Sequence, residues 1–93
     1  FGFLITCKEG VDRNKLVQEI ESRGVQTRML FAGNLTKHPC FDQMRASGKG
    51  YRIAGSLENT DRIMKDTFWI GVYPGMTDEM LQAMADAIKD ALN

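Results

Sequence analysis

The sequence FWIGVY, residues Phe68–Tyr73, predicts the central strand of the fold. Aromatic and β-branched residues favour strands, and successive side chains of a strand point to opposite faces of the sheet. Pro74-Gly75 ends this strand. We expect helices of the chain to cover one face and another domain to cover the other. Both faces are apolar, because Phe68, Ile70 and Val72 alternate with Trp69, Gly71 and Tyr73.

The segment before this strand predicts a strand, a helix and a second strand. Apolar residues alternate along residues 1–7, which indicates a half-buried strand. Asp12 is a suitable N-cap for a helix that runs to about Arg23, and Gly24 supplies the left-handed stop. Residues 25–31 then form the second strand.

Three helical segments are predicted in the remaining sequence. Pro39, at a first helical position, starts a short helix over residues 38–46, and residues 51–54 form a brief extended piece. Ser56 caps the next helix, and Thr77 begins the terminal one. We expect each of these last two helices to bury an apolar stripe: Leu57, Ile63 and Met64 in the first, and Leu81, Met84, Ile88 and Leu92 in the amphipathic terminal helix.

The order of elements is therefore β-α-β-loop-α-β-α. About three strands and three main helices predict an α+β fold, a two-layer sandwich with helices on one face of a small, mainly antiparallel sheet. The opposite face would stay uncovered, although its residues are too apolar to face water. The residues of this outer face are Gly2, Leu4, Trp69, Gly71 and Tyr73.

Length and charge limit the functions open to the chain. Its 93 residues make one domain, 1–93, with room for a modest core. Twelve basic and twelve acidic residues cancel, so no net field attracts nucleic acid or an anionic membrane. No apolar run could cross a bilayer and no signal peptide opens the chain, so we expect a cytoplasmic protein. Because the chain begins at Phe1 within a strand-like run, we expect a fragment of a longer protein.

The stretch TRMLFAGNLTKHPCF, residues 27–41, gathers most of the polar candidates. Gly33 and Pro39 predict a shaped loop, and loops on a rigid scaffold often carry binding groups. The planar guanidinium of Arg28 could clamp a carboxylate or phosphate, with an ordinary salt bridge as the alternative. For Arg52 we favour the salt bridge. The same loop also carries Asn34, Lys37 and His38.

The sequence does not contain a self-sufficient catalytic or metal-binding cluster. His38 is the single histidine, so neither a Ser-His-Asp triad nor a histidine metal site can be assembled. Cys7 and Cys40 are too far apart in sequence for a closely spaced ligand set, and we expect Cys40 to face the core. Residues 47–50, SGKG, lack the spacing of a phosphate-binding loop and indicate a flexible connector.

Two long stretches carry a resemblance to a known family. They are GVQTRMLFAGNLTKHPCF and YRIAGSLENTDRIMKDTFWIGVYPGMT. Together they resemble the C-terminal small domain of the sugar aminotransferase (DegT/DnrJ/EryC1/StrS) superfamily, whose members are fold-type-I pyridoxal-phosphate enzymes. The resemblance covers essentially the whole chain and is closest to the CDP-4-keto-6-deoxyglucose-3-dehydrase branch. Ordinary aminotransferases carry a histidine where Asn34 stands here, so Asn34 favours this branch.

The resemblance implies one part of a larger enzyme. That enzyme would remove the C-3 hydroxyl of a CDP-4-keto-6-deoxy sugar in deoxysugar or lipopolysaccharide biosynthesis. Its cofactor, PLP or PMP, would be bound mainly by a large N-terminal domain outside residues 1–93. The residue at the cofactor's reactive carbon, a lysine or a histidine, would lie there too. The iron–sulfur cluster that one dehydrase type carries would likewise lie upstream.

Within this chain the resemblance implies a substrate-facing wall and no catalytic residue. Arg28, Asn34 and Lys37 would bind the substrate, and an amide at position 34 can hydrogen-bond a sugar hydroxyl but cannot shuttle a proton. The implied partners are the nucleotide sugar, the large domain and a second copy in a homodimer, with neither nucleic acid nor membrane. The fragment alone would be inactive.

Two alternatives remain open from the sequence. The first is the small domain of a PLP-dependent nucleotide-sugar aminotransferase, which the residue at the cofactor position of the upstream chain would distinguish. The second is a free-standing small-molecule-binding regulatory module. That module would be a stable, monodisperse protein of 93 residues, whereas an enzyme fragment would expose an apolar sheet face and self-associate.

Overall fold

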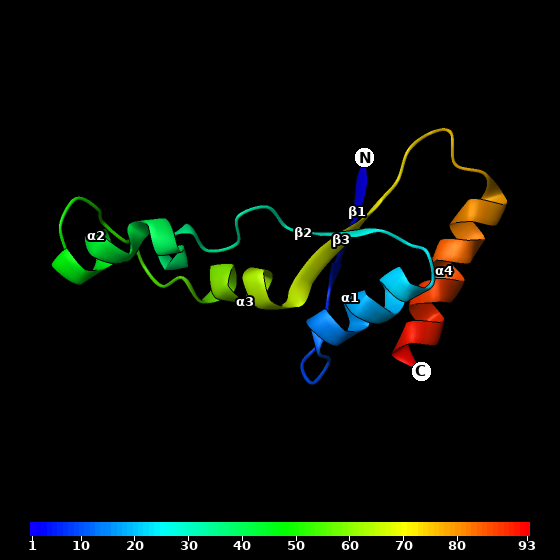
Figure 1. The fold of residues 1–93 in the computed structure, drawn as a ribbon, viewed down its shortest axis with the longest axis horizontal. Coiled ribbons are helices and arrows are strands. Elements are labelled where there is room, and N and C mark those ends of the chain that lie inside the picture. Colours follow the sequence, from blue (N-terminus) through cyan, green and yellow to red (C-terminus); the bar gives the residue numbers. More distant parts are fainter.

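The computed structural model describes all 93 residues and shows a three-stranded antiparallel sheet at the centre of an elongated molecule (Figure 1). The central strand is β3 (Thr67–Gly71), which pairs with β1 (Gly2–Thr6) on one side and β2 (Thr27–Met29) on the other. The principal dimensions are 53 × 30 × 22 Å. The predicted α+β class with a central third strand is confirmed, although this strand ends at Gly71 rather than at the predicted Tyr73.

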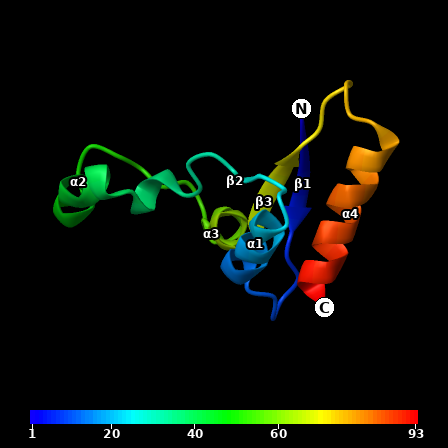
Figure 2. The ribbon, with the colours of Figure 1, turned by 45° about the vertical axis from the view of Figure 1, so that its right-hand side comes forward.

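Two helices cover one face of this sheet. They are α1 (Arg13–Ser22) and α4 (Asp78–Leu92), which contact each other beside the strands (Figures 1 and 2). Facing residues of paired strands point to the same side, and Ile5 and Met29 both lie opposite Phe68. The buried apolar core on this side is Cys7, Leu16, Val17, Ile20, Phe68 and Ile70.

The predicted helix caps that depend on local sequence are present. Asp12 accepts a hydrogen bond from the backbone N–H of Lys15 at 3.1 Å and begins α1. Thr77 accepts one from the N–H of Met80 at 3.2 Å and begins α4. These bonds satisfy amide groups that have no partner inside the first helical turn. Gly24 follows α1 with φ +84°, as its predicted stop requires.

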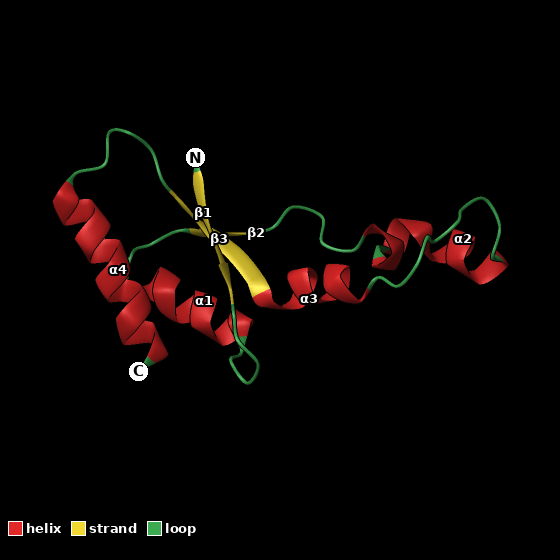
Figure 3. Ribbon diagram, turned by 180° about the vertical axis from the view of Figure 1, so that it is seen from behind, coloured by secondary structure: helices red, strands yellow, loops and turns green.

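Residues 30–66 form an arm that projects from the sheet (Figure 3). The chain leaves β2 and passes through two 3₁₀ turns and the short helix α2, and then returns through α3 to β3. None of the residues in α2 or α3 is buried. The bounds of these elements are Leu35–Lys37 and Pro39–Phe41 for the 3₁₀ turns, Asp42–Ser47 for α2 and Glu58–Asp66 for α3.

Several local predictions for the arm are wrong. The second strand stops at Met29 rather than residue 31, because Phe31 takes a left-handed backbone conformation with φ +38°. Residues 51–54 form no strand. The N-cap of α3 is Leu57, although the hydroxyl of Ser56 accepts a 3.4 Å bond from Glu58 N–H.

Three predictions of which side chains are buried are also wrong. Cys40 is exposed, because it lies in a 3₁₀ turn of the arm, away from the core. In α3, Ile63 is exposed. In α4, Leu81 and Leu92 are exposed, and Ala87 is buried instead. The contact face of α4 is therefore a narrower stripe of small and medium residues, namely Met84, Ala87, Ile88 and Ala91.

The outer face of the sheet is apolar and uncovered. The rings of Phe1 and Trp69 lie 5.2 Å apart, and Gly2 permits this packing because a Cβ there would come within 2.5 Å of the indole. Leu4 and Phe31 rim the same shallow pocket and are both exposed, Phe31 by 83%. The prediction of an exposed apolar sheet face is confirmed. No helical segment combines the length and the apolar composition that a transmembrane helix needs.

Candidate functional site

The polar loop is attached to α3 through the backbone around Gly33. Gly33 has φ +62°, which is costly for any residue with a Cβ. A Cβ at this position would lie 2.6 Å from Cγ of Met64, so the loop backbone packs directly on that side chain. The next amide, of Asn34, points at Sδ of Met64 at 3.5 Å. Both the backbone conformation and the close approach require glycine here.

The side-chain amide of Asn34 is hydrogen-bonded to other groups of this chain. Its Oδ1 accepts hydrogen bonds from the backbone N–H of Thr36 at 3.0 Å and from the Thr36 hydroxyl at 2.6 Å, which caps the first 3₁₀ turn. Its Nδ2 donates to Oδ1 of Asp61 at 2.8 Å. Asn34 is only 2% exposed. One N–H of the amide stays free of any protein partner, and both acceptor positions of Oδ1 are filled.

Lys37 meets Asn34 at the same carboxylate. Its Nζ lies 2.9 Å from Oδ1 of Asp61, and the lysine side chain is 55% exposed. The hydrogen bond from Asn34, and then the bond and charge of Lys37, hold the pKa of Asp61 below its ordinary value. The local sequence around Asp61, NTDRIM, does not indicate this role. Its role depends on a contact across 27 residues.

Arg45 of α2 braces the far side of the loop. Its guanidinium donates to the backbone carbonyls of Thr36 and His38 and pairs with Asp42. His38, the single histidine, places Nε2 against the carbonyl of Ala32. These contacts satisfy loop carbonyls, so His38 has a structural position here. A small apolar pocket of about 180 Å³ lies beside the brace, lined by Leu35, Thr36, Phe41, Met44, Arg45 and Tyr51.

Arg28 lies apart from the other two predicted residues. It is exposed on β2, opposite Trp69 of β3, and therefore on the outer face of the sheet. Its Nη1 donates to the carbonyl of Thr27 at 2.9 Å, and no carboxylate pairs with it. The structure thus brings Asn34 and Lys37 together and leaves Arg28 free at the open face. Arg52, for which a salt bridge was predicted, is exposed and has none.

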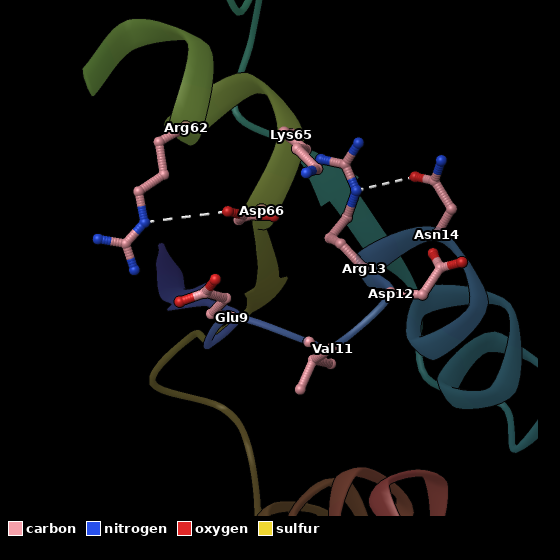
Figure 4. Close-up of a pocket in the computed structure, with 9 residues that line it drawn as sticks. Glu9, Val11, Asp12, Arg13, Asn14, Arg62, Lys65 and Asp66 are labelled. Atoms are coloured by element: carbon pink, nitrogen blue, oxygen red, sulfur yellow. Dashed lines mark hydrogen bonds and ion pairs between the residues drawn. The ribbon is translucent and has the colours of Figure 1, made fainter. Parts of the chain in front are cut away.

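A second polar site, drawn in Figure 4, lies between the turn after β1 and the end of α3. This open cleft has a volume of about 810 Å³ and carries three basic and three acidic side chains. Arg13 donates through Nη1 to the carbonyls of Met64 and Thr67, at 3.0 and 2.9 Å, and Arg62 faces Asp66 at 3.9 Å. Two of the three basic side chains therefore already have partners. The hydrogen bonds of Arg13 hold the end of α3 against α1.

The cleft drawn in Figure 4 does not fit a pyridoxal-phosphate site. Such a site needs donors free to cradle a phosphate, whereas Arg13 is spent on backbone carbonyls and Arg62 has a carboxylate partner. A cluster of iron and sulfur needs cysteine thiolates. Burial, and then the charge of Asp66, raises the pKa of the Cys7 thiol, and Cys40 lies exposed in the arm. No three His, Cys, Asp or Glu side chains gather to hold a metal ion.

The structure is thus a small sheet with helices on one face and an open apolar face on the other. A polar loop is braced on an arm beside it. The comparisons with known proteins identify the domain further. The sequence profile of the DegT/DnrJ/EryC1/StrS aminotransferase family matches residues 1–89. The chain belongs to this family.

Two relatives are similar to nearly the whole chain. One is a dTDP-4-dehydro-2,6-dideoxy-D-glucose 3-dehydratase from Saccharopolyspora spinosa, 47% identical over 92 residues, or 97% of this chain. The other is lipopolysaccharide biosynthesis protein RfbH from Salmonella typhimurium, also 47% identical over 92 residues. The chain spans only 19% and 20% of the length of these two proteins.

Proposed function

We propose that residues 1–93 are the C-terminal, substrate-side domain of a PLP- or PMP-dependent nucleotide-sugar 3-dehydratase. The observation that carries this proposal is the 47% identity, over 97% of the chain, to a protein named as a sugar-nucleotide 3-dehydratase. The equal identity to a lipopolysaccharide biosynthesis protein supports a role in making deoxysugars for that polymer. We propose a CDP-linked 4-keto-6-deoxy sugar as the substrate. Turnover of the CDP-linked and dTDP-linked sugars by the full-length enzyme tests this choice.

Arg28, Asn34 and Lys37 are the proposed substrate-binding residues of this domain. Arg28 and Lys37 are supported by exposure, because each keeps N–H donors that no protein group takes. Guanidinium and ammonium groups bind phosphate and hydroxyl oxygens well. Asn34 retains one free N–H and otherwise holds the loop, so its contribution is mainly to loop geometry.

The cofactor belongs to a part of the enzyme outside residues 1–93. We base this on the absence of a fitting phosphate cradle in the cleft between α1 and α3, where the arginines are engaged. An iron–sulfur cluster, as one dehydrase type carries, has no ligand set among the two separated cysteines and would also lie elsewhere. The contribution of this chain is to bind and orient the substrate.

The open sheet face is the proposed contact with the large domain. Phe1, Leu4, Phe31 and Trp69 together form an apolar surface that would gain by leaving water. The homodimer of the full-length enzyme and its cytoplasmic location are parts of the same proposal. Sedimentation of the full-length protein and cell fractionation test them directly.

Paired substitutions in the full-length enzyme test the binding role. Replacing Arg28 and Asn34 together by alanine is expected to raise KM for the nucleotide sugar by about thirtyfold or more. Each charge-assisted or buried bond is worth roughly 1–3 kcal/mol, and about 1.4 kcal/mol corresponds to a factor of ten. Arg52→Ala is the matched control, because Arg52 is exposed and unpaired. Unchanged turnover and affinity in the double variant would refute the assignment.

Two other readings give different outcomes. A nucleotide-sugar aminotransferase would carry lysine at the cofactor position and return an amino sugar rather than a 3-deoxy sugar. A free-standing regulatory module would bind a ligand as a monodisperse protein of 93 residues. The exposed outer face of the sheet disfavours the second reading, because a stable monomer rarely leaves such a surface in water.

A further inference from the structure

One carboxylate oxygen of Asp61 joins the two candidate residues of the loop. Oδ1 accepts from Nδ2 of Asn34 at 2.8 Å and lies 2.9 Å from Nζ of Lys37. We propose that Asp61 is a positioning residue, which fixes Lys37 and the loop in the orientation that receives an anionic, oxygen-rich ligand. This inference rests on the proposed function, and it names the residue through which the substrate-facing loop is set.

The packing around Asp61 shows that the loop depends on it. Asn34 is the only buried residue among residues 30–66, so no apolar core holds this part of the chain in place. Its amide reaches Asp61 across the gap between the loop and α3. A buried amide that loses its partner is costly, so the Asn34–Asp61 bond selects one loop conformation. Gly33 against Met64 adds a second contact to the same helix.

The helix that carries Asp61 is itself tied to the body of the domain. Arg13 of α1 donates to the carbonyls of Met64 and Thr67, at the end of α3 and the start of β3. Asp61 lies one helical turn before Met64. Contacts therefore connect α1 to α3 and α3 to the loop. Asp61 makes the second connection, because it contacts both loop side chains, Asn34 and Lys37.

Lys37 is the group that gains from this arrangement. It has three N–H donors, of which Asp61 takes one, and the side chain remains 55% exposed. Two donors are thus free for a ligand. An ammonium group on a flexible four-carbon stem binds phosphate as a point charge, and it binds better when the stem is held in one orientation. The ion pair with Asp61 restrains Lys37 in this way, although it also offsets part of the positive charge of the ammonium group.

Steady-state kinetics of the full-length enzyme test the inference with nucleotide sugar as the varied substrate. Asp61→Ala is expected to raise KM about tenfold while kcat changes less than twofold, since the loss lies in binding geometry. Asp61→Asn keeps an acceptor for Asn34 but loses the ion pair with Lys37, so an intermediate KM is expected. Glu58→Ala, on the same helix and without a side-chain partner, should leave both constants unchanged.

A double-mutant cycle with Lys37→Met separates positioning from a general structural effect. If Asp61 acts through Lys37, adding Asp61→Ala to Lys37→Met should raise KM by much less than tenfold. Two results would overturn the inference and leave the proposed function intact. The first is that the effects of the two substitutions on KM are additive. The second is that KM is unchanged in both Asp61 variants but raised in Lys37→Met. If Lys37→Met and Arg28→Ala also leave KM unchanged, the proposed substrate-facing wall itself is wrong. Circular dichroism checks folding, and Asp61→Asn decides if Asp61→Ala is unfolded.

Discussion

The body and the arm of this domain are stabilised in different ways. The body, residues 1–29 and 67–93, contains every buried apolar side chain, with Phe68 and Ile20 fully enclosed between the sheet and the helices. The arm, residues 30–66 (Figure 3), buries only the polar Asn34. Hydrophobic burial is non-directional, whereas hydrogen bonds fix geometry. The body therefore supplies stability, and the arm supplies a defined shape.

This difference predicts where the molecule opens first. Segments with few buried apolar contacts open locally at a lower free energy than the core. The arm depends on three side chains, Asn34, Asp61 and Arg45, which all bond to groups of the loop. Losing any of these should loosen the arm and leave the body folded. Losing a core residue should affect the body as a whole.

The largest effect is expected from Phe68→Ala. Phe68 is fully buried and lies between β1 and β2 on the helix-covered face. Removing such a ring costs about 3–5 kcal/mol, a large part of the roughly 5–15 kcal/mol that stabilises a typical domain. Amide hydrogen exchange should accelerate in peptides from β1, α1 and α4 alike. Phe3→Ala is the matched control, since Phe3 is 60% exposed, and similar acceleration in both variants would contradict this view of the core.

A smaller and local effect is expected from Asn34→Ala. It removes the acceptor that Thr36 uses and one of the two donors to Asp61, which keeps Lys37, at a cost of roughly 1–3 kcal/mol. Exchange should accelerate in peptides covering residues 30–41 and stay unchanged in α1. Asn59→Ala, at an exposed position of α3 without a side-chain bond, should change neither. Equal acceleration in the arm and in α1 would show that the two regions are not separate units.

The same division explains what the sequence could predict. Asp12, Thr77 and Gly24 act on residues within four positions, so their caps follow from local pattern. The strands and their apolar faces follow from alternation, which a sheet imposes directly. Cys40 and Ile63 were expected to be buried because an apolar residue usually is, but the arm offers them no core.

The candidate site was predictable only in part. The loop was recognised by its glycine, proline and polar residues, and Asn34 and Lys37 do come together there. Asp61 could not be assigned, because nothing local indicates that a helix 27 residues away supplies the shared carboxylate. The placement of Arg28 on the outer face follows from strand alternation, yet its distance from the other two depends on how the arm leaves the sheet. Such long-range contacts are set by tertiary structure.

The smallest effect expected is a loosening of the arm in acid. Hydrogen bonds from Asn34 and Lys37 hold the pKa of Asp61 below its ordinary value of 3.8, so the folded state binds this proton less readily than the unfolded state. The stabilisation is then fully present above pH 3.8 and is lost as the pH falls through the lower folded value. In the wild type, the amide exchange rate of residues 30–41, corrected for its intrinsic acid dependence, should increase over this acidic pH range. In Asp61→Asn this increase should be absent. An increase of the same size in both proteins would show that another carboxylate causes the acid sensitivity.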